Sequence, residues 1–152
     1  MIASMTRLED TLLGLFTEIA IVEHLARTRV ERDVLEDLTS NQFGILNYFV
    51  RTHPSPDTVA GIAWSFQQEE DYTFSNVSLL ADKGYVTLTD AAAERDTVVD
   101  ITDAGRKAQQ EHLERVGPEI RQLVSEIPSD ELETAYRVLH DIRLVLDNLP
   151  DR

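Results

Sequence analysis

Seven side chains near the middle of the sequence could make charged or hydrogen-bonded contacts with a partner. Three are successive carboxylates, and the four that follow can hydrogen-bond. They are Glu69, Glu70, Asp71, Tyr72, Thr73, Ser75 and Asn76. Hydroxyl and amide groups on a helix can hydrogen-bond the base edges of a nucleic acid, whereas carboxylates repel phosphate and attract basic groups. One short segment therefore holds residues suited to two opposite kinds of partner.

Catalytic and metal-binding patterns are missing from the sequence. It contains no phosphate loop, no glycine-rich dinucleotide turn and no recognisable pair of a nucleophile with its base. Its four histidines are scattered and it has no cysteine, so no zinc-ligand set can be read from it. The four histidines are His24, His53, His112 and His140. We therefore predict a protein that is not an enzyme and uses neither a metal nor a cofactor.

Length and charge set further limits. The 152 residues suffice for one domain, and a formal charge of −14 repels DNA and anionic membranes at long range, although a local basic patch could still bind DNA. The apolar run from Leu12 to Val22 contains Thr17 and Glu18 and is too short to span a bilayer. We expect a soluble cytoplasmic protein that does not bind membranes, and the absence of cysteine fits a reducing compartment.

The two ends of the chain carry helical patterns. Apolar residues recur every three or four positions at each end, which predicts two amphipathic helices. The first set is Leu8, Leu12, Leu15, Ile19, Val22 and Ala26, and the last is Leu132, Ala135, Leu139, Ile142, Leu146 and Leu149. Ser129 is the expected N-cap of the last helix. These apolar faces could pack on each other or on a second copy of the chain.

Three shorter helices are predicted between them. Thr39 and Gln42 have the spacing of a capping box that opens the first. The second should begin with Ser55 as its cap and Pro56 at its first position. The third should end at Lys83–Gly84, where glycine can take the left-handed conformation that stops a helix.

After Gly84 the apolar residues no longer recur every three or four positions, as in a helix, but every second position, as in a strand. Tyr85–Thr89 and Thr97–Ile101 are β-type runs that predict a hairpin. Thr102–Asp103 should cap a further helix, which Gly117–Pro118 should kink or interrupt. Three helices followed by a two-stranded wing make a winged helix-turn-helix, whose third helix normally enters the major groove of DNA.

Four blocks of sequence, in this order and spacing, resemble the MarR family of bacterial transcriptional regulators. They are Leu38–Leu46, Thr58–Ala63, Val77–Val86 and Val99–Arg106. The spacing from Ala63 to Gly84 and the segment Ile127–Leu132 are also similar to the family's. The resemblance covers most of the chain and implies a single MarR-like domain, 1–152, which forms a homodimer. In it, 36–101 would be the winged helix-turn-helix, and 5–33 and 103–150 the dimerisation helices.

The resemblance also implies a DNA-binding surface and a ligand cleft. Tyr72, Thr73, Ser75 and Asn76 would read bases from the recognition helix, and an arginine on the wing would enter the minor groove. A cleft between the dimer helices and the winged domain would take a small aromatic or anionic ligand that releases the DNA. The residues expected to line it are His24, Tyr48 and Trp64.

The sequence departs from the family pattern in its charges. Family members usually have an Asp-x-Arg motif on the wing, where this chain has Arg95 at the arginine position but Ala93 at the aspartate position. Between residues 57 and 101 the only cations are Lys83 and Arg95, against nine acidic residues, which leaves −7, half of the net charge. Lys83 and Arg106 are the candidates for contacts with the DNA backbone.

Two functional hypotheses follow. In the first, the chain is a dimeric MarR-like regulator that binds DNA and is released from the DNA by a small ligand. In the second, the acidic face made of Glu69, Glu70 and Asp71 no longer binds DNA and instead contacts a basic partner protein. The acids have a simpler explanation as well, because carboxylates at a helix N-terminus stabilise it by about 0.3–1 kcal/mol each. Tyr72 could equally be a buried anchor.

Overall fold

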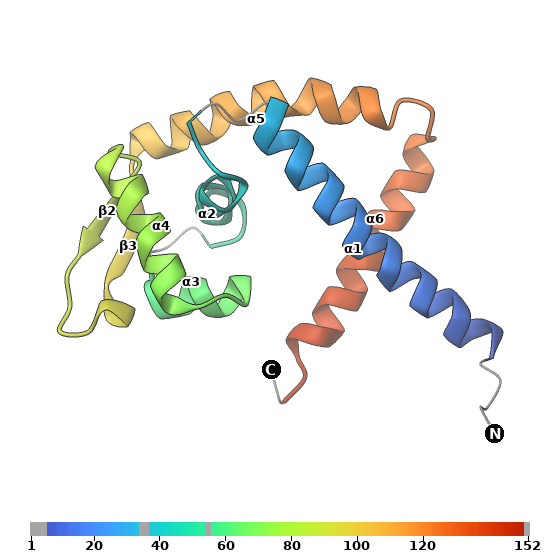
Figure 1. Cartoon of the computed structure of the whole chain (residues 1–152), viewed down its shortest axis with the longest axis horizontal. Helices are drawn as coiled ribbons and strands as arrows, with labels where there is room; N and C mark the ends of the chain where they lie inside the picture. Colours follow the sequence, from blue (N-terminus) through green and yellow to red (C-terminus); the bar gives the residue numbers. More distant parts are fainter. Residues whose placement is uncertain (1–5, 34–36, 54–55, 151–152) are drawn as a thin grey trace. The chain divides into compact units, whose positions relative to one another are not determined.

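The computed structural model describes residues 6–33, 37–53 and 56–150 of the chain. Within them lie six α-helices, three short strands and one 3-10 helix (Figure 1). The helices are α1 (Arg7–Asp33), α2 (Ser40–Arg51), α3 (Val59–Phe66), α4 (Glu70–Asp82), α5 (Asp103–Leu123) and α6 (Ser129–Asp147). The other elements are β1 (Asp57–Thr58), β2 (Val86–Thr89), η1 (Glu94–Asp96) and β3 (Val98–Ile101). The prediction of a mainly helical fold with a small β wing is confirmed.

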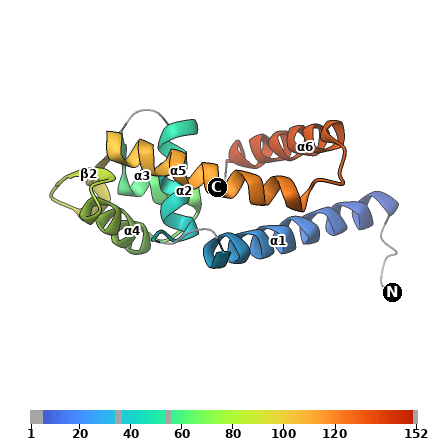
Figure 2. The same cartoon turned by 90° about the horizontal axis from the view of Figure 1, so that it is seen from above.

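The chain forms two compact units, residues 1–116 and residues 117–152. The larger unit contains α1 to α4, the strands and most of α5, whereas the smaller unit contains the end of α5 and all of α6. Figure 2 shows α1 and α6 as long, uninterrupted helices. The residues discussed below as a binding surface all belong to the larger unit.

An apolar core holds the short helices and the sheet together. Side chains from α2, α3, α4 and β3 in this core have 0% exposed surface. They include Ile45, Leu46, Phe49, Val59, Ile62, Val77, Leu80 and Val99. Fully burying one such side chain contributes about 1.5–3 kcal/mol, so the core fixes the orientation of α4 relative to α2 and α3.

The capping signals correctly predict the start of α2 and the end of α4, but not the start of α3. The Thr39–Gln42 capping box opens α2, and Gly84 ends α4 with a φ of 77°. The prediction for the second short helix is wrong, because α3 begins at Val59 and its cap is Thr58, whose hydroxyl accepts from the Gly61 N–H at 3.0 Å. Ser55 lies outside the described residues.

The sheet contains one strand more than the predicted hairpin. β2 and β3 pair antiparallel as expected, with Val86 opposite Ile101. β1 pairs with the other edge of β3, with Thr58 opposite Val98, so the order is β1-β3-β2. This extended pairing ahead of α3 is the reason that the helix begins later than Pro56.

Two predictions for the last helices are also corrected. The predicted interruption at Gly117–Pro118 does not occur, since α5 continues through Pro118 to Leu123, and the alternative of a kink there stays a prediction. Ser129 is the first residue of α6 and not its cap. The Pro128 carbonyl already accepts from the N–H groups of Glu131 and Leu132, at 3.1 and 3.2 Å.

The start of α5 is tied to the wing. As predicted, the Thr102 hydroxyl caps α5 by accepting from the Gly105 N–H at 3.0 Å. The same hydroxyl donates to the Gly84 carbonyl at 2.6 Å, and the Thr102 N–H donates to the Tyr85 carbonyl at 3.0 Å. These bonds fix α5 relative to the end of α4 and the first strand of the wing.

Membrane-spanning helices and metal-ligand clusters are both absent from the described residues. None of their helices combines the length and the hydropathy that crossing a membrane requires. Nor do they contain a group of three or more histidine, cysteine, aspartate and glutamate side chains placed to hold a metal ion.

Candidate nucleic-acid interface

Two of the four residues expected to read bases face the interior. Thr73 is 0% exposed and Asn76 is 5% exposed. The Thr73 hydroxyl donates to the Glu69 carbonyl at 3.1 Å, and the Asn76 amide donates to the Tyr72 carbonyl at 3.0 Å. The expectation of base contacts therefore narrows to Tyr72 and Ser75.

The two buried residues belong to a set of hydrogen bonds that orient α4. Gln42 on α2 is 5% exposed, and its amide donates to the Asn76 oxygen at 3.3 Å. Gln68, in the turn before α4, donates to the Thr73 hydroxyl at 2.7 Å and accepts from the Asn41 amide at 2.8 Å. Leaving one partner of a buried pair unsatisfied costs about 1–3 kcal/mol, so these bonds favour a single orientation of α4.

The opposite face of α4 is open. Tyr72 is 52% exposed, Ser75 is exposed, and Leu79 is 49% exposed. Sequence reasoning missed Leu79, although it lies four residues after Ser75 and so on the same face of the helix. Its neighbour Leu80 is fully buried, which makes Leu79 the leucine that points outward.

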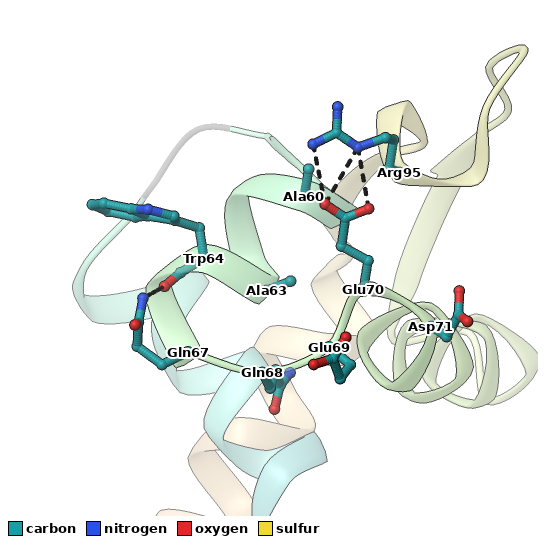
Figure 3. Close-up of a pocket in the computed structure, with 9 residues that line it drawn as sticks. All are labelled: Ala60, Ala63, Trp64, Gln67, Gln68, Glu69, Glu70, Asp71 and Arg95. Carbon is teal, nitrogen blue, oxygen red and sulfur yellow. Dashed lines mark hydrogen bonds and ion pairs between the residues drawn. The ribbon is translucent and has the colours of Figure 1, made fainter. Parts of the chain in front are cut away.

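A cleft of about 580 Å³ opens between α3, the turn before α4 and η1 (Figure 3). Its lining residues are Ala60, Ala63, Trp64, Gln67, Gln68, Glu69, Glu70, Asp71 and Arg95. Figure 3 shows that Glu70 reaches toward Arg95, whereas Glu69 and Asp71 lie apart from it. Successive residues of a helix do not face the same way, so Glu69, Glu70 and Asp71 line this cleft with different orientations.

Arg95, on the wing, forms an ion pair with Glu70 of α4. Arg95 Nε lies 3.3 and 3.1 Å from the two Glu70 carboxylate oxygens, and Nη2 lies 3.1 Å from Oε1. The side chains of Arg95 and Glu70 are 58% and 42% exposed. Hydrogen bonding from Arg95 lowers the pKa of Glu70, and the attraction between the two charges lowers it further.

The second cation of this region is also next to a carboxylate. Lys83 Nζ lies 3.9 Å from Asp37 Oδ2, with the lysine side chain 34% exposed. The other Asp37 oxygen lies 3.1 Å from Nε2 of the buried His112. Arg106, on α5, is exposed. Both cations between residues 57 and 101 therefore lie close to acidic partners.

The three residues expected to share a ligand cleft lie on three different helices, α1, α2 and α3. Trp64 is 54% exposed and lines the cleft of Figure 3, at the end away from Arg95. The Tyr48 hydroxyl donates to Asp57 at 2.8 Å, which is a bond between α2 and β1. His24 is an exposed residue of α1. The sequence does not specify which faces of α1, α2 and α3 meet, and a cleft that these residues share in a dimer stays a prediction.

A second cleft, of about 530 Å³, lies where α1 meets the start of α2 and the start of α4. Its lining residues are Glu23, Arg27, Glu31, Ser40, Asn41, Phe66, Gln68 and Tyr72. Arg27 pairs with Glu23 at 2.8 Å, and the Glu31 carboxylate accepts from the Ser40 hydroxyl at 2.6 Å. Tyr72 thus borders this cleft from α4.

Comparisons with known proteins identify the fold. No protein-family model and no curated protein matches the sequence. Among solved structures, a MarR-family transcriptional regulator from Rhodococcus sp. RHA1 superposes with a TM-score of 0.73 at 17% identity, over 91% of this chain and 96% of that one. The transcriptional regulator BldR from Sulfolobus solfataricus gives 0.65 at 22% identity, over 90% and 99%.

A third solved structure is CouR from Rhodococcus jostii RHA1 bound to p-coumaroyl-CoA, with a TM-score of 0.70 at 16% identity, over 84% of this chain and 90% of that one. The chain therefore has the winged-helix fold of MarR-family transcriptional regulators. BldR and the Rhodococcus MarR-family protein are transcriptional regulators.

The pair between Arg95 and Glu70 makes a prediction for acid titration. Arg95→Ala should raise the pKa of Glu70 toward its ordinary value, as measured from the carboxyl carbon shift by NMR. Because folding lowers this pKa, the pair stabilises the fold at neutral pH, and that contribution is lost as pH falls through the lowered value. An unchanged Glu70 titration in the variant would show that the pair does not form in solution.

Proposed function

We propose that this chain is a homodimeric, MarR-like transcription regulator that binds double-stranded DNA through α4 and the wing. The observation that carries the proposal is the open face of α4, where Tyr72 and Leu79 are about half exposed on a helix linked to the wing by Glu70 and Arg95. Residues 36–101 would meet DNA, and 5–33 and 103–150 would form the dimer within one functional domain, 1–152. Such a regulator would act in the cytoplasm.

Exposed apolar side chains on the terminal helices support the dimer. Large hydrophobic residues that are at least 40% exposed recur along α1 and α6. They include Leu8, Leu13, Phe16, Val22 and Leu25 on α1, and Tyr136, Val138, Val145 and Leu146 on α6. Repeated apolar exposure of this kind typically marks an interface with another chain.

The dimer predicts a particle of twice the 17.2 kDa chain mass in light scattering. Val145→Asp should shift the particle toward the monomer, because it would bury a charge in the interface. Val145 is 65% exposed within the single chain, so the same change should leave the helical circular dichroism intact. A monomeric wild-type protein would instead support packing of the two apolar faces within one chain.

The DNA-binding role assigns different tasks to the exposed residues. Tyr72 and Ser75 would hydrogen-bond base edges, and Leu79 would make apolar contact, as with a thymine methyl group. Arg95 would enter the minor groove from the wing. Lys83 and Arg106 would contact phosphates, which gives affinity and register but little sequence information.

Arg95→Ala should reduce the affinity for duplex DNA from the gene's own upstream region by about tenfold or more, because it removes a groove contact and a charge. Fluorescence anisotropy at low salt measures this directly. Arg137→Ala is the control, since Arg137 is an exposed cation on α6, outside the winged unit. Equal affinities of the wild type and Arg95→Ala would count against the role of Arg95.

The cleft beside α1 is the place proposed for a small aromatic or anionic ligand. It offers two aromatic side chains, Phe66 and Tyr72, and one cation, Arg27. A ligand held there would touch Tyr72, which is also exposed on the face of α4 proposed for DNA. Occupancy could therefore compete with base contact. CouR, whose fold is similar, was solved with the aromatic thioester p-coumaroyl-CoA.

Benzoate, a small aromatic carboxylate, is a suitable probe of this cleft. It should perturb the NMR signals of Tyr72, and Arg27→Gln should weaken its binding about fivefold or more by removing the cation. Arg29→Gln removes the same charge two residues further along α1, at a position outside the cleft lining, and should have little effect. Equal weakening by both variants would reject the cleft as the binding site.

The alternative is a regulator that contacts a basic protein, and one observation favours it. Glu69 and Asp71 are exposed, and no ion pair to another described residue involves either of them. Together with the exposed ring of Trp64, they would suit a lysine or arginine side chain. Wild-type protein that binds no duplex DNA even at low salt would favour this alternative.

A further inference from the structure

The ion pair between Arg95 and Glu70 joins residues that lie 25 positions apart in the sequence. The arginine presents two N–H groups, on Nε and Nη2, to both oxygens of the carboxylate at 3.1–3.3 Å. A guanidinium binds a phosphate through the same paired N–H geometry. Two of the three nitrogens that Arg95 could offer to DNA, Nε and Nη2, are therefore already engaged by a carboxylate of the recognition helix.

The wing holds Arg95 in this place. η1 packs against α3 and the start of α4. Just beyond η1, Thr97 is 2% exposed, and its carbonyl accepts from the Val59 N–H at 3.0 Å. The backbone on this side of Arg95 is thus anchored, while its side chain is 58% exposed. Release of the pair needs only rotation of exposed side chains and no rearrangement of the wing.

We propose that Glu70 acts as an internal competitor of DNA for Arg95, so that DNA must displace this carboxylate before the wing arginine can enter the groove. This inference rests on the proposed DNA-binding function. Glu70 would then set the affinity of the chain without touching a base. Its position on the recognition helix makes the competition local, since the same helix must approach the groove when Arg95 does.

The exposure of the pair limits the strength of the competition. Ion pairs between exposed groups are weak, because water screens them and two long side chains lose freedom. DNA can therefore displace Glu70. Removal of any negative charge near DNA reduces repulsion of phosphate. We expect removal of the Glu70 charge to tighten DNA binding by a further factor of roughly two to five, because it also releases Arg95.

Glu69 provides a matched control for charge. It precedes Glu70 by one residue and lines the same cleft, but its side chain makes no ion pair within the described residues. Glu69→Gln and Glu70→Gln each remove one negative charge from the start of α4. Only Glu70→Gln releases Arg95.

The test measures duplex DNA affinity of the full-length protein by fluorescence anisotropy for the wild type, Glu69→Gln and Glu70→Gln. The same three forms are then measured with Arg95→Ala added. Glu70→Gln should bind roughly two- to fivefold more tightly than Glu69→Gln when Arg95 is present. With Arg95→Ala the difference should disappear, because no arginine is left to release.

Three results of this comparison would overturn the proposal. Equal affinities of Glu69→Gln and Glu70→Gln would show that the pair does not compete with DNA. Weaker binding by Glu70→Gln would mean that Glu70 orients Arg95 for DNA instead of withholding it. An advantage of Glu70→Gln that persists with Arg95→Ala would assign the effect to the repulsion between Glu70 and phosphate.

Failure of the proposed function gives a different pattern. If neither the wild type nor Glu70→Gln binds duplex DNA at low salt, both the function and the competition are rejected. If only Glu70→Gln binds, the native chain is not a DNA-binding protein, yet the competition is supported. Hydrogen exchange at the Arg95 Nε–H, followed by NMR without DNA, should be faster in Glu70→Gln, and an unchanged rate would show that the pair is not formed.

Discussion

Burial of one face of α4 determines what the other face can do. Val77 and Leu80 enter the apolar core with no exposed surface, and Thr73 and Asn76 are held beside them by Gln68 and Gln42. With these contacts made, α4 has only one open face, which carries Tyr72, Ser75 and Leu79. The apolar core therefore selects the residues available to a partner before any charge is considered.

The acidic start of α4 is less uniform than its sequence indicates. Carboxylates there are favourable to the helix itself, since its N-terminus carries partial positive charge. The three carboxylates point in different directions, and of the three only Glu70 forms an ion pair with Arg95 (Figure 3). Glu69 and Asp71 remain exposed, so phosphates that approach α4 would meet negative charge, while the main opposing cation, Arg95, is already paired. This arrangement predicts modest affinity for DNA.

The strongest local signals in the sequence predicted the fold well. The capping box at Thr39, the glycine at residue 84 and the helical spacing of the terminal apolar residues act through neighbours in the chain, and their helices formed as expected. The two-residue strand β1 was missed because it is too short to show a period and is formed by pairing with β3, about 40 residues later. That pairing also moved the start of α3.

The candidate site was harder to predict for the same reason. Thr73 and Asn76 have the types and spacing of base-reading residues, but tertiary hydrogen bonds turn them inward. The contact between Glu70 and Arg95 depends on where the wing meets α4, and no local pattern contains that information. Leu79 could have been predicted, since the four-residue spacing from Ser75 places it on the open face.

The salt dependence of duplex DNA binding by the wild-type protein tests the central claim most directly. A dimer that meets DNA with Lys83, Arg95 and Arg106 from each chain should show sequence-dependent binding, with a slope of log K against log salt no steeper than about −5.4, or roughly −0.9 for each phosphate neutralised. Labelled duplexes carrying the gene's upstream region, and scrambled duplexes of equal length, provide the comparison by fluorescence anisotropy. Absence of binding at low salt, or equal binding to both duplexes, would contradict the claim that this winged-helix protein reads DNA.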